Sequence, residues 1–139
     1  MIGTYVLFLS SEKNMDIDIG NLGRFHFPKG IYAYIGSAMG RAVSLENRIK
    51  RHQKLAKEKK GNKKWHIDYF TTSSGVEITG VVKIIGKNIE CRVAELMKKS
   101  GGKLVAQGFG SSDCKCNTHF FSVTQEIADV FLRNLPDVF

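Results

Sequence analysis

The chain has 139 residues, of which 42% are hydrophobic and 24% are charged, and its formal net charge is +8. These values are those of a globular protein, and the length predicts one domain, spanning residues 1–139. No apolar run approaches the roughly 20 residues of a membrane span, and the N-terminus lacks a signal-peptide pattern, so we expect a cytoplasmic protein with no membrane partner.

The first part of the chain predicts four short strands. Gly3–Ser10 is rich in β-branched and aromatic residues, and Met15–Ile19 alternates apolar with acidic residues. Arg24–Phe27 and Ile31–Ile35 predict two further strands, separated by a turn that contains Pro28 and Gly30. Strands this close together favour antiparallel hairpins.

The rest of the chain predicts helices that alternate with strands. Ser44, Asn88 and Thr124 are placed to cap three helices. The expected segments, in chain order, are a helix from 45 that frays before 61, an undecided segment at 63–70, a strand at 75–85 that bends or folds back near Gly80, a helix at 89–99, strands at 103–107 and 119–123, and a helix at 125–134. The predicted class is α+β, with a small, mostly antiparallel sheet flanked by helices.

The positive charge is concentrated between residues 41 and 64. This segment holds ten Lys and Arg against two Glu, while the remaining eleven basic and eleven acidic residues cancel. A local excess of this kind favours a polyanion partner, with DNA expected and RNA as the alternative. The residues expected to contact nucleic acid are Ser37, Arg41, Arg51, Lys54, Lys57, Lys60, Lys63, Lys64, Trp65 and His66. A solvated helix face is the plainer interpretation of the charge.

An aromatic strand precedes this basic helix. The strand ends in Tyr34-Ile35-Gly36-Ser37-Ala38, and the helix carries Arg48 and His52 four residues apart. Phosphodiester cleavage needs an activated water and directed donors for the phosphate, and the fork of N–H groups on arginine matches phosphate oxygens. The pattern therefore favours phosphate chemistry, although each of these side chains also has an ordinary packing role available to it.

These residues resemble the GIY-YIG nucleases, a superfamily that includes homing endonucleases, a subunit of excision repair and Holliday-junction resolvers. Residues 34–38 match its second signature, and residues 46–52 match its helix with the catalytic arginine. The whole chain is also similar to an uncharacterised, mainly archaeal family of about this length in that superfamily, which occurs fused to endonuclease III-like repair proteins. The stretches that carry this likeness are GTYVL, FPKGIYAYIGSA, RHQK, WHIDYF, IECRVAEL and GFGSSDCKCNTHFF.

The first signature of the superfamily has two candidate positions. Gly30-Ile31-Tyr32 spells it literally, but Tyr32 and Tyr34 would share one strand, whereas the resemblance implies tyrosines on neighbouring strands. We therefore assign the first signature to Gly3-Thr4-Tyr5. The long connection that results, residues 11–30, is expected to form an inserted hairpin.

The resemblance implies a role for each site residue. Tyr5 or Tyr34 would orient or deprotonate the attacking water, Arg48 would contact the scissile phosphate, and His52 would assist by a hydrogen bond. Glu90 would hold Mg²⁺ or Mn²⁺, with Glu95 as the alternative. The two glutamate side chains would point in directions about 140° apart around a helix, so they cannot both face one site.

The second half of the chain offers further polar residues with open roles. Trp65 is expected either to stack on bases or to join an aromatic core, and His66 and Asp68 are either site residues or a buried hydrogen-bonded pair. Cys91, Cys114, Cys116 and His119 form a candidate Zn²⁺ set. Ordinary thiols, or a nucleophile at Cys114 or Cys116, are the other interpretations.

Three functions follow from these observations. The first is a metal-dependent endonuclease that hydrolyses DNA, acting on branched or damaged substrates in repair. The second is a nucleic-acid-binding module with the same fold and no catalysis. The third is an RNA-binding domain stabilised by zinc. Charge does not separate the first two functions, because both need the basic helix.

Overall fold

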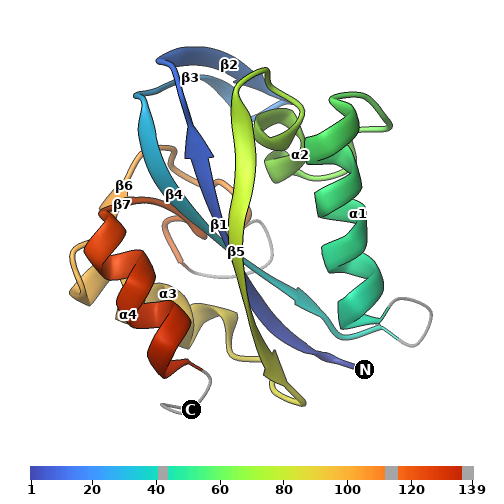
Figure 1. Ribbon diagram of the computed structural model, residues 1–139, viewed down its shortest axis with the longest axis vertical. Coiled ribbons are helices and arrows are strands. Elements are labelled where there is room, and N and C mark those ends of the chain that lie inside the picture. The colour runs from blue at the N-terminus through green and yellow to red at the C-terminus, as the bar shows by residue number, and fades with distance from the viewer. Residues whose placement is uncertain (41–43, 112–115, 136–139) are drawn as a thin grey trace.

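A five-stranded antiparallel sheet is the centre of the protein, seen in a computed structural model that describes residues 1–40, 44–111 and 116–135 (Figure 1). Its strand order is β5-β1-β4-β7-β6. The strands are β1 (Gly3–Ser11), β4 (Gly30–Ala38), β5 (Val76–Ile85), β6 (Lys103–Leu104) and β7 (Phe120–Val123). Arg41 and Cys114, two of the expected site residues, lie outside the described residues.

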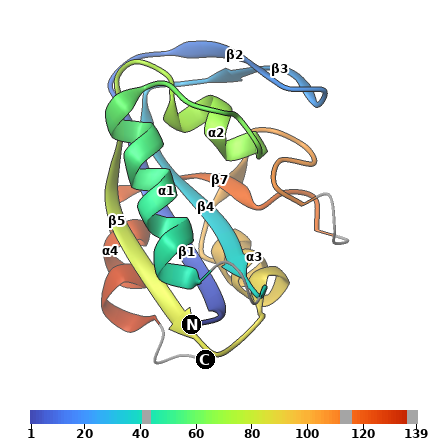
Figure 2. The same cartoon turned by 90° about the vertical axis from the view of Figure 1, so that its right-hand side faces the viewer.

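Residues between β1 and β4 form a separate hairpin, as expected for the insertion. Its strands are β2 (Met15–Ile19) and β3 (Gly23–Phe27), which pair only with each other. Figure 2 shows this hairpin lying across the end of the sheet, above α2. Met15, Ile19 and Phe27 turn inward and join the core, which explains the alternation of the sequence here.

Helices cover both faces of the sheet (Figure 1). The helices α1 (Leu45–Glu58) and α2 (His66–Thr71) lie on one face, and α3 (Glu90–Lys99) and α4 (Gln125–Asn134) lie on the other. Alternate residues of β1 feed the two cores: Leu7 packs on the side of α1 and α2, whereas Phe8 packs on the side of α3 and α4. Burial on both faces explains why β1 is almost continuously apolar.

The structure confirms the α+β class, the mostly antiparallel sheet and the helices on its flanks. It also settles two open segments. Residues 66–71 form a short helix, and residues 76–85 form one strand whose pairing with β1 shifts register between Phe8 and Leu9. Among the described residues, no helix combines the length and apolarity needed to cross a bilayer.

Two local predictions were wrong. Asn88 does not cap α3, because Ile89 occupies the N-cap position and its backbone N–H donates to Thr4 Oγ1 at 3.0 Å. The expected strand at 103–107 is limited to Lys103–Leu104. In both places a contact from a distant part of the chain, on β1 or β7, decides the local structure.

Candidate active site

Tyr5 and Tyr34 lie side by side on neighbouring strands, as the assignment of Gly3-Thr4-Tyr5 required. In the antiparallel register of β1 and β4, Leu7 lies opposite Tyr34 and Tyr5 lies opposite Gly36. The two tyrosine rings are 6.4 Å apart and tilted by 58°. Both side chains point to the face of the sheet that carries α1.

Gly36 makes room for the Tyr5 ring. A Cβ atom at position 36 would lie 2.6 Å from both Cζ and Oη of Tyr5, and 3.1 Å from the Tyr34 ring. These distances are far inside van der Waals contact, so no side chain fits there without displacing Tyr5. The glycine of the Tyr-Ile-Gly sequence is therefore needed for the packing of the tyrosine pair.

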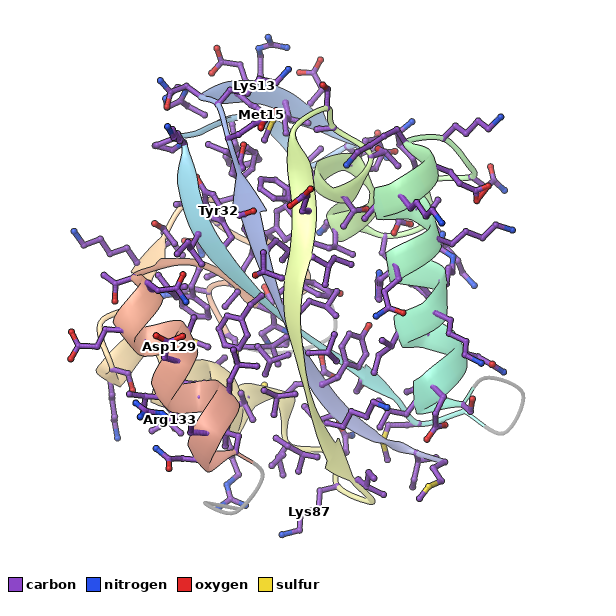
Figure 3. All side chains as sticks on the ribbon, viewed as in Figure 1. Lys13, Met15, Tyr32, Lys87, Asp129 and Arg133 are labelled. Atoms are coloured by element: carbon purple, nitrogen blue, oxygen red, sulfur yellow. The ribbon has the colours of Figure 1, made fainter. Side chains whose placement is uncertain are left out.

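Tyr32, the tyrosine of the literal Gly-Ile-Tyr sequence, belongs to the core. Its ring stacks on Phe120 at 5.2 Å and meets Phe70 edge-on at 5.1 Å. Its hydroxyl donates to the Pro28 carbonyl. Figure 3 shows it among the side chains packed between β4 and its neighbours. Its surroundings are those of a structural aromatic residue.

His52 joins α1 to the tyrosine pair. Helical spacing directs Leu45, Ile49 and His52 inward, and His52 is fully buried, with Nε2 2.7 Å from Tyr5 Oη. Burial lowers the His52 pKa to about 4, an effect that the neighbouring Asp68 charge opposes only in part. At neutral pH this imidazole is uncharged. Among the described residues, its Nδ1 has no hydrogen-bond partner.

Both tyrosines are neutral phenols in this environment. Burial raises the pKa of Tyr5 and of Tyr34 well above the ordinary value, and the negative charge of Glu90 raises both further. The Arg48 charge acts in the opposite direction. These hydroxyls are therefore protonated and able to donate a hydrogen bond over the whole physiological pH range.

Arg48 lies one helical turn before His52, on the edge of the same face of α1. Its guanidinium lies 4.8 Å from the centre of the Trp65 ring, and its Nη1 donates to the Ser37 carbonyl at 2.5 Å. The flat face of the guanidinium is thus held against an aromatic ring. Its Nε makes no hydrogen bond within the described part of the chain.

Glu90 is the first residue of α3, the helix that lies beside the end of β4 in Figure 2, and its side chain contacts Ser37 on that strand. Its Oε1 accepts a 2.5 Å hydrogen bond from Ser37 Oγ, and its Oε2 lies 3.3 Å from His119 Nδ1. Partial burial would raise its pKa, but the contacts with His119 and Ser37 and the charge of Arg48 outweigh burial and lower the pKa. The carboxylate is therefore ionised, and it lines a cleft of about 340 Å³.

Glu95 does not lie with these residues. It is exposed and lines a different groove, beside Lys98 and Leu104. The structure therefore brings Glu90, and not Glu95, to Ser37 and Arg48. This separation follows from their angular difference around the helix.

Asp68 organises the start of α2 and holds Arg51. It is completely buried, and its carboxylate accepts hydrogen bonds from the Arg51 guanidinium at 2.9 and 3.0 Å and from the backbone N–H of Lys64 and Trp65. These bonds outweigh burial and lower its pKa. Of the two alternatives for His66 and Asp68, the structure excludes the hydrogen-bonded pair, because residues 66–71 form a helix and His66 Nδ1 accepts from Gly110 N–H instead.

Trp65 lies at the junction of the basic residues. Its ring is half-buried, and Arg48, Arg51 and Lys64 lie 4.8, 4.5 and 5.1 Å from its centre. Trp65 packs against the core with part of its ring and leaves the rest exposed to solvent. Its face is already shared by cations, so the ring stabilises the guanidinium groups beside the candidate site.

Five of the residues expected to contact nucleic acid are lysines that form an exposed basic surface. We call this the lysine surface; its members are Lys54, Lys57, Lys60, Lys63 and Lys64, all of them exposed. Lys59 is excluded because its Nζ donates to the backbone carbonyls of Thr71 and Val76. Arg51 is committed to Asp68 and to the Asn62 carbonyl.

Three members of the expected zinc set lie together. Cys91, Cys116 and His119 place their ligand atoms within 4.8 Å of one another. They lie beside Glu90, whose carboxylate contacts His119.

Residues 4–138 match a family model described as a domain of unknown function, DUF123. The chain belongs to this family. No curated protein and no solved structure matches the chain. The grouping of Tyr5, Tyr34, Arg48, His52 and Glu90 in this DUF123 domain is therefore an observation of its own geometry.

The sequence did not predict the contacts that two candidate residues, Ser37 and Asp68, make in the site. Ser37 was expected to contact nucleic acid, but its carbonyl and hydroxyl connect Arg48 and Glu90. Asp68 accepts two hydrogen bonds from Arg51 and so holds its guanidinium in place. A signal was present for Asp68, since an acidic residue in the first turn of a helix favours a capping role. The Ser37 links depend on contacts across 11 and 53 residues, and no local pattern encodes them.

Proposed function

We propose that this domain is a metal-dependent endonuclease that hydrolyses DNA phosphodiester bonds in the manner of the GIY-YIG nucleases. The observation that carries the proposal is the link through Ser37, which accepts from Arg48 and donates to Glu90. Arg48, the proposed phosphate-binding group, and Glu90, the proposed metal ligand, are thereby both held beside Ser37 at the end of β4. The tyrosine pair with His52 lies on the adjoining strands and helix.

The donor set fits a magnesium ion. Glu90 is ionised, lines a cleft and retains lone pairs beyond the one that Ser37 occupies. Mg²⁺ characteristically keeps several waters and is held by one or two carboxylates, so a single glutamate is sufficient. When bound, Mg²⁺, or Mn²⁺ in its place, supplies Lewis-acid stabilisation of the charge on the phosphate.

The protein groups supply positioning and proton transfer. Arg48 binds a non-bridging oxygen of the phosphate, with its guanidinium oriented by Trp65 and Ser37. The water oxygen forms a bond to phosphorus while Tyr5 takes a proton from that water and passes its own proton to His52 Nε2. The bond from phosphorus to the leaving oxygen breaks, and the leaving oxygen takes a proton from solvent. The negative phosphate raises the pKa of His52 from its resting value, which makes His52 a better acceptor when DNA is bound.

The lysine surface supports DNA as the partner. Two exposed lysines lie on the helix that carries Arg48 and three follow its end, and they offer contacts to the DNA backbone without base readout. This mode suits recognition of DNA shape, so we propose branched or damaged DNA as the substrate, in repair. We also propose that the protein acts in the cytoplasm, which accords with its odd number of cysteines, three.

A second candidate function is nucleic-acid binding without catalysis. The observation that favours it is the burial of the tyrosines, since Tyr5 is 1% exposed and Tyr34 is 7% exposed. A water reaches these hydroxyls only after local movement. The basic helix and lysine surface would serve a binding module equally well.

Cleavage and binding assays on one panel of DNAs separate the two functions. The panel contains single-stranded, duplex, flap and four-way junction DNA, with Mg²⁺ or Mn²⁺, and an RNA duplex tests the alternative polymer. We expect cleavage by the wild type, a loss of at least about 100-fold for Arg48→Ala, and no change for Arg133→Ala, an exposed arginine on α4. DNA that is bound by the wild type and never cut would establish the binding module instead.

A further inference from the structure

A cluster of two thiols and an imidazole lies behind Glu90, outside the proposed catalytic residues. Cys91 is the second residue of α3, Cys116 lies in the loop before β7, and His119 immediately precedes β7. The three ligand atoms lie within 4.8 Å of one another, and Cys91 Sγ is 4.0 Å from His119 Nε2. Three segments of the chain thus bring soft ligands to one point.

The distance from Cys91 Sγ to His119 Nε2 is close to that of a tetrahedral zinc site, and all three ligand atoms lie within 4.8 Å of one another. Zn–S bonds of about 2.3 Å and Zn–N bonds of about 2.1 Å place the ligand atoms of such a site roughly 3.6–3.8 Å apart. The observed 4.0 Å separation needs only a small rotation of the side chains to reach that value. Thiolate and imidazole ligands select Zn²⁺ over Mg²⁺, which prefers oxygen.

The surroundings of the cluster are those of a metal-binding site. His119 is buried, Cys116 is half-buried and Cys91 is exposed, so one side is held by the fold and the other is open to entry of a metal. The His119 ring uses its two nitrogens in opposite directions: Nε2 faces Cys91, whereas Nδ1 lies 3.3 Å from Glu90 Oε2. Histidines that bind zinc characteristically donate their other N–H to a carboxylate.

We propose that Cys91, Cys116 and His119 hold a zinc ion, and that His119 connects this ion to Glu90. In this arrangement His119 is neutral, its Nε2 binds the metal, and its Nδ1–H donates to the Glu90 carboxylate. The zinc site thereby fixes the orientation of Glu90, making His119 a positioning residue. The zinc site does not depend on the proposed endonuclease activity, whereas its consequence for catalysis rests on that activity.

Metal analysis of the purified protein tests the site directly. We expect close to one Zn²⁺ per chain after dialysis against metal-free buffer. Co²⁺-loaded protein should show the intense charge-transfer absorption of cobalt bound to thiolates. Cys91→Ser, Cys116→Ser and His119→Ala should each lose the bound zinc and weaken or abolish this absorption.

A matched control and a stability measurement keep the test decisive when a variant folds poorly. His26→Ala removes an exposed histidine on β3 and should retain zinc. Zinc should raise the Tm of the metal-stripped wild type and of His26→Ala, but not that of Cys91→Ser, because a ligand stabilises only a fold that binds it. Wild-type protein that takes up neither Zn²⁺ nor Co²⁺ while folded would overturn the proposal.

The connection to Glu90 has its own measurement. Glu90→Gln should weaken zinc binding by roughly 10- to 100-fold, the usual effect of removing a carboxylate behind a histidine ligand. Glu95→Gln, five residues further along the same helix, should not change it. Equal zinc affinities for the two variants would remove the connection. Because the readouts are metal content and affinity, a negative result here is distinct from an absence of DNA cleavage.

Discussion

At the scale of single residues, the site depends on how closely groups approach within the sheet. Gly36 admits the Tyr5 ring, Tyr5 meets His52, and burial keeps that histidine uncharged. These contacts predict that small substitutions on β4 and α1 have effects larger than their size suggests.

Gly36→Ala should destabilise the protein by about 1–3 kcal/mol, because the added methyl group would overlap the buried Tyr5 ring. Chemical denaturation measures the loss. Gly40→Ala is the matched control, since a Cβ atom at position 40 meets nothing within 4 Å. Equal stabilities for the two variants would show that Tyr5 is not packed against Gly36.

His52 should make stability depend on pH. Its pKa is lowered from 6.5 to about 4 by burial, so between these values the unfolded chain binds the proton and the folded chain does not. Stability therefore falls as pH falls, by about 2 kcal/mol between pH 7 and pH 5. His52→Gln should lack this component, whereas His26→Gln, at an exposed position, should keep it. Parallel pH profiles for wild type and His52→Gln would refute this account of His52.

At the scale of elements, sequence patterns correctly predicted those strand and helix starts that depend on neighbouring residues. The alternation in Met15–Ile19 and the capping residues Ser44 and Thr124 gave the correct strand and helix starts, because burial and capping there involve near neighbours. The start of α3 was misplaced because the backbone N–H of its N-cap residue, Ile89, donates to Thr4, 85 residues away. A pattern in the sequence does not carry such a contact.

The start of α2 depends on Asp68, and Asp68→Asn should cost about 3 kcal/mol. The substitution removes the charge that compensates Arg51 and weakens the bonds to the backbone of Lys64 and Trp65. Asp18→Asn is the control, since the Asp18 and Arg24 side chains are 73% and 62% exposed and such pairs contribute little. Unfolding in denaturant measures both variants, and a negligible loss for Asp68→Asn would contradict the role of this carboxylate.

At the scale of the whole molecule, the candidate site is assembled from segments that lie far apart in the sequence. Glu90 and Ser37 are 53 residues apart, and Tyr5 and His52 are 47 apart. The residue types of the site were predictable from the sequence, because the chemistry restricts them. The choice of Glu90 over Glu95 and the bridging role of Ser37 required the packing of α3 against β4.

The lysine surface should account for most of the salt dependence of DNA binding. Replacing its five lysines with glutamine should reduce the magnitude of the slope of log K against log salt by about 3–4. The reason is that fewer phosphates are then neutralised, so fewer counterions are released on binding. Replacing Lys98, Lys99 and Lys103, near the end of α3 and on β6, should leave the slope unchanged. An unaltered slope after loss of the lysine surface would place the DNA elsewhere.

The central claim is that Glu90, fixed by Ser37 beside Arg48, serves metal-dependent DNA cleavage. The most direct measurement is the single-turnover cleavage rate of the best DNA substrate at saturating Mg²⁺, for wild type, Glu90→Gln and Glu95→Gln, with DNA affinity measured alongside. We predict that Glu90→Gln loses at least about 100-fold in rate while retaining DNA affinity, and that Glu95→Gln matches the wild type. A wild type that binds DNA without cutting it, or equal rates for the two glutamate variants, would contradict the account.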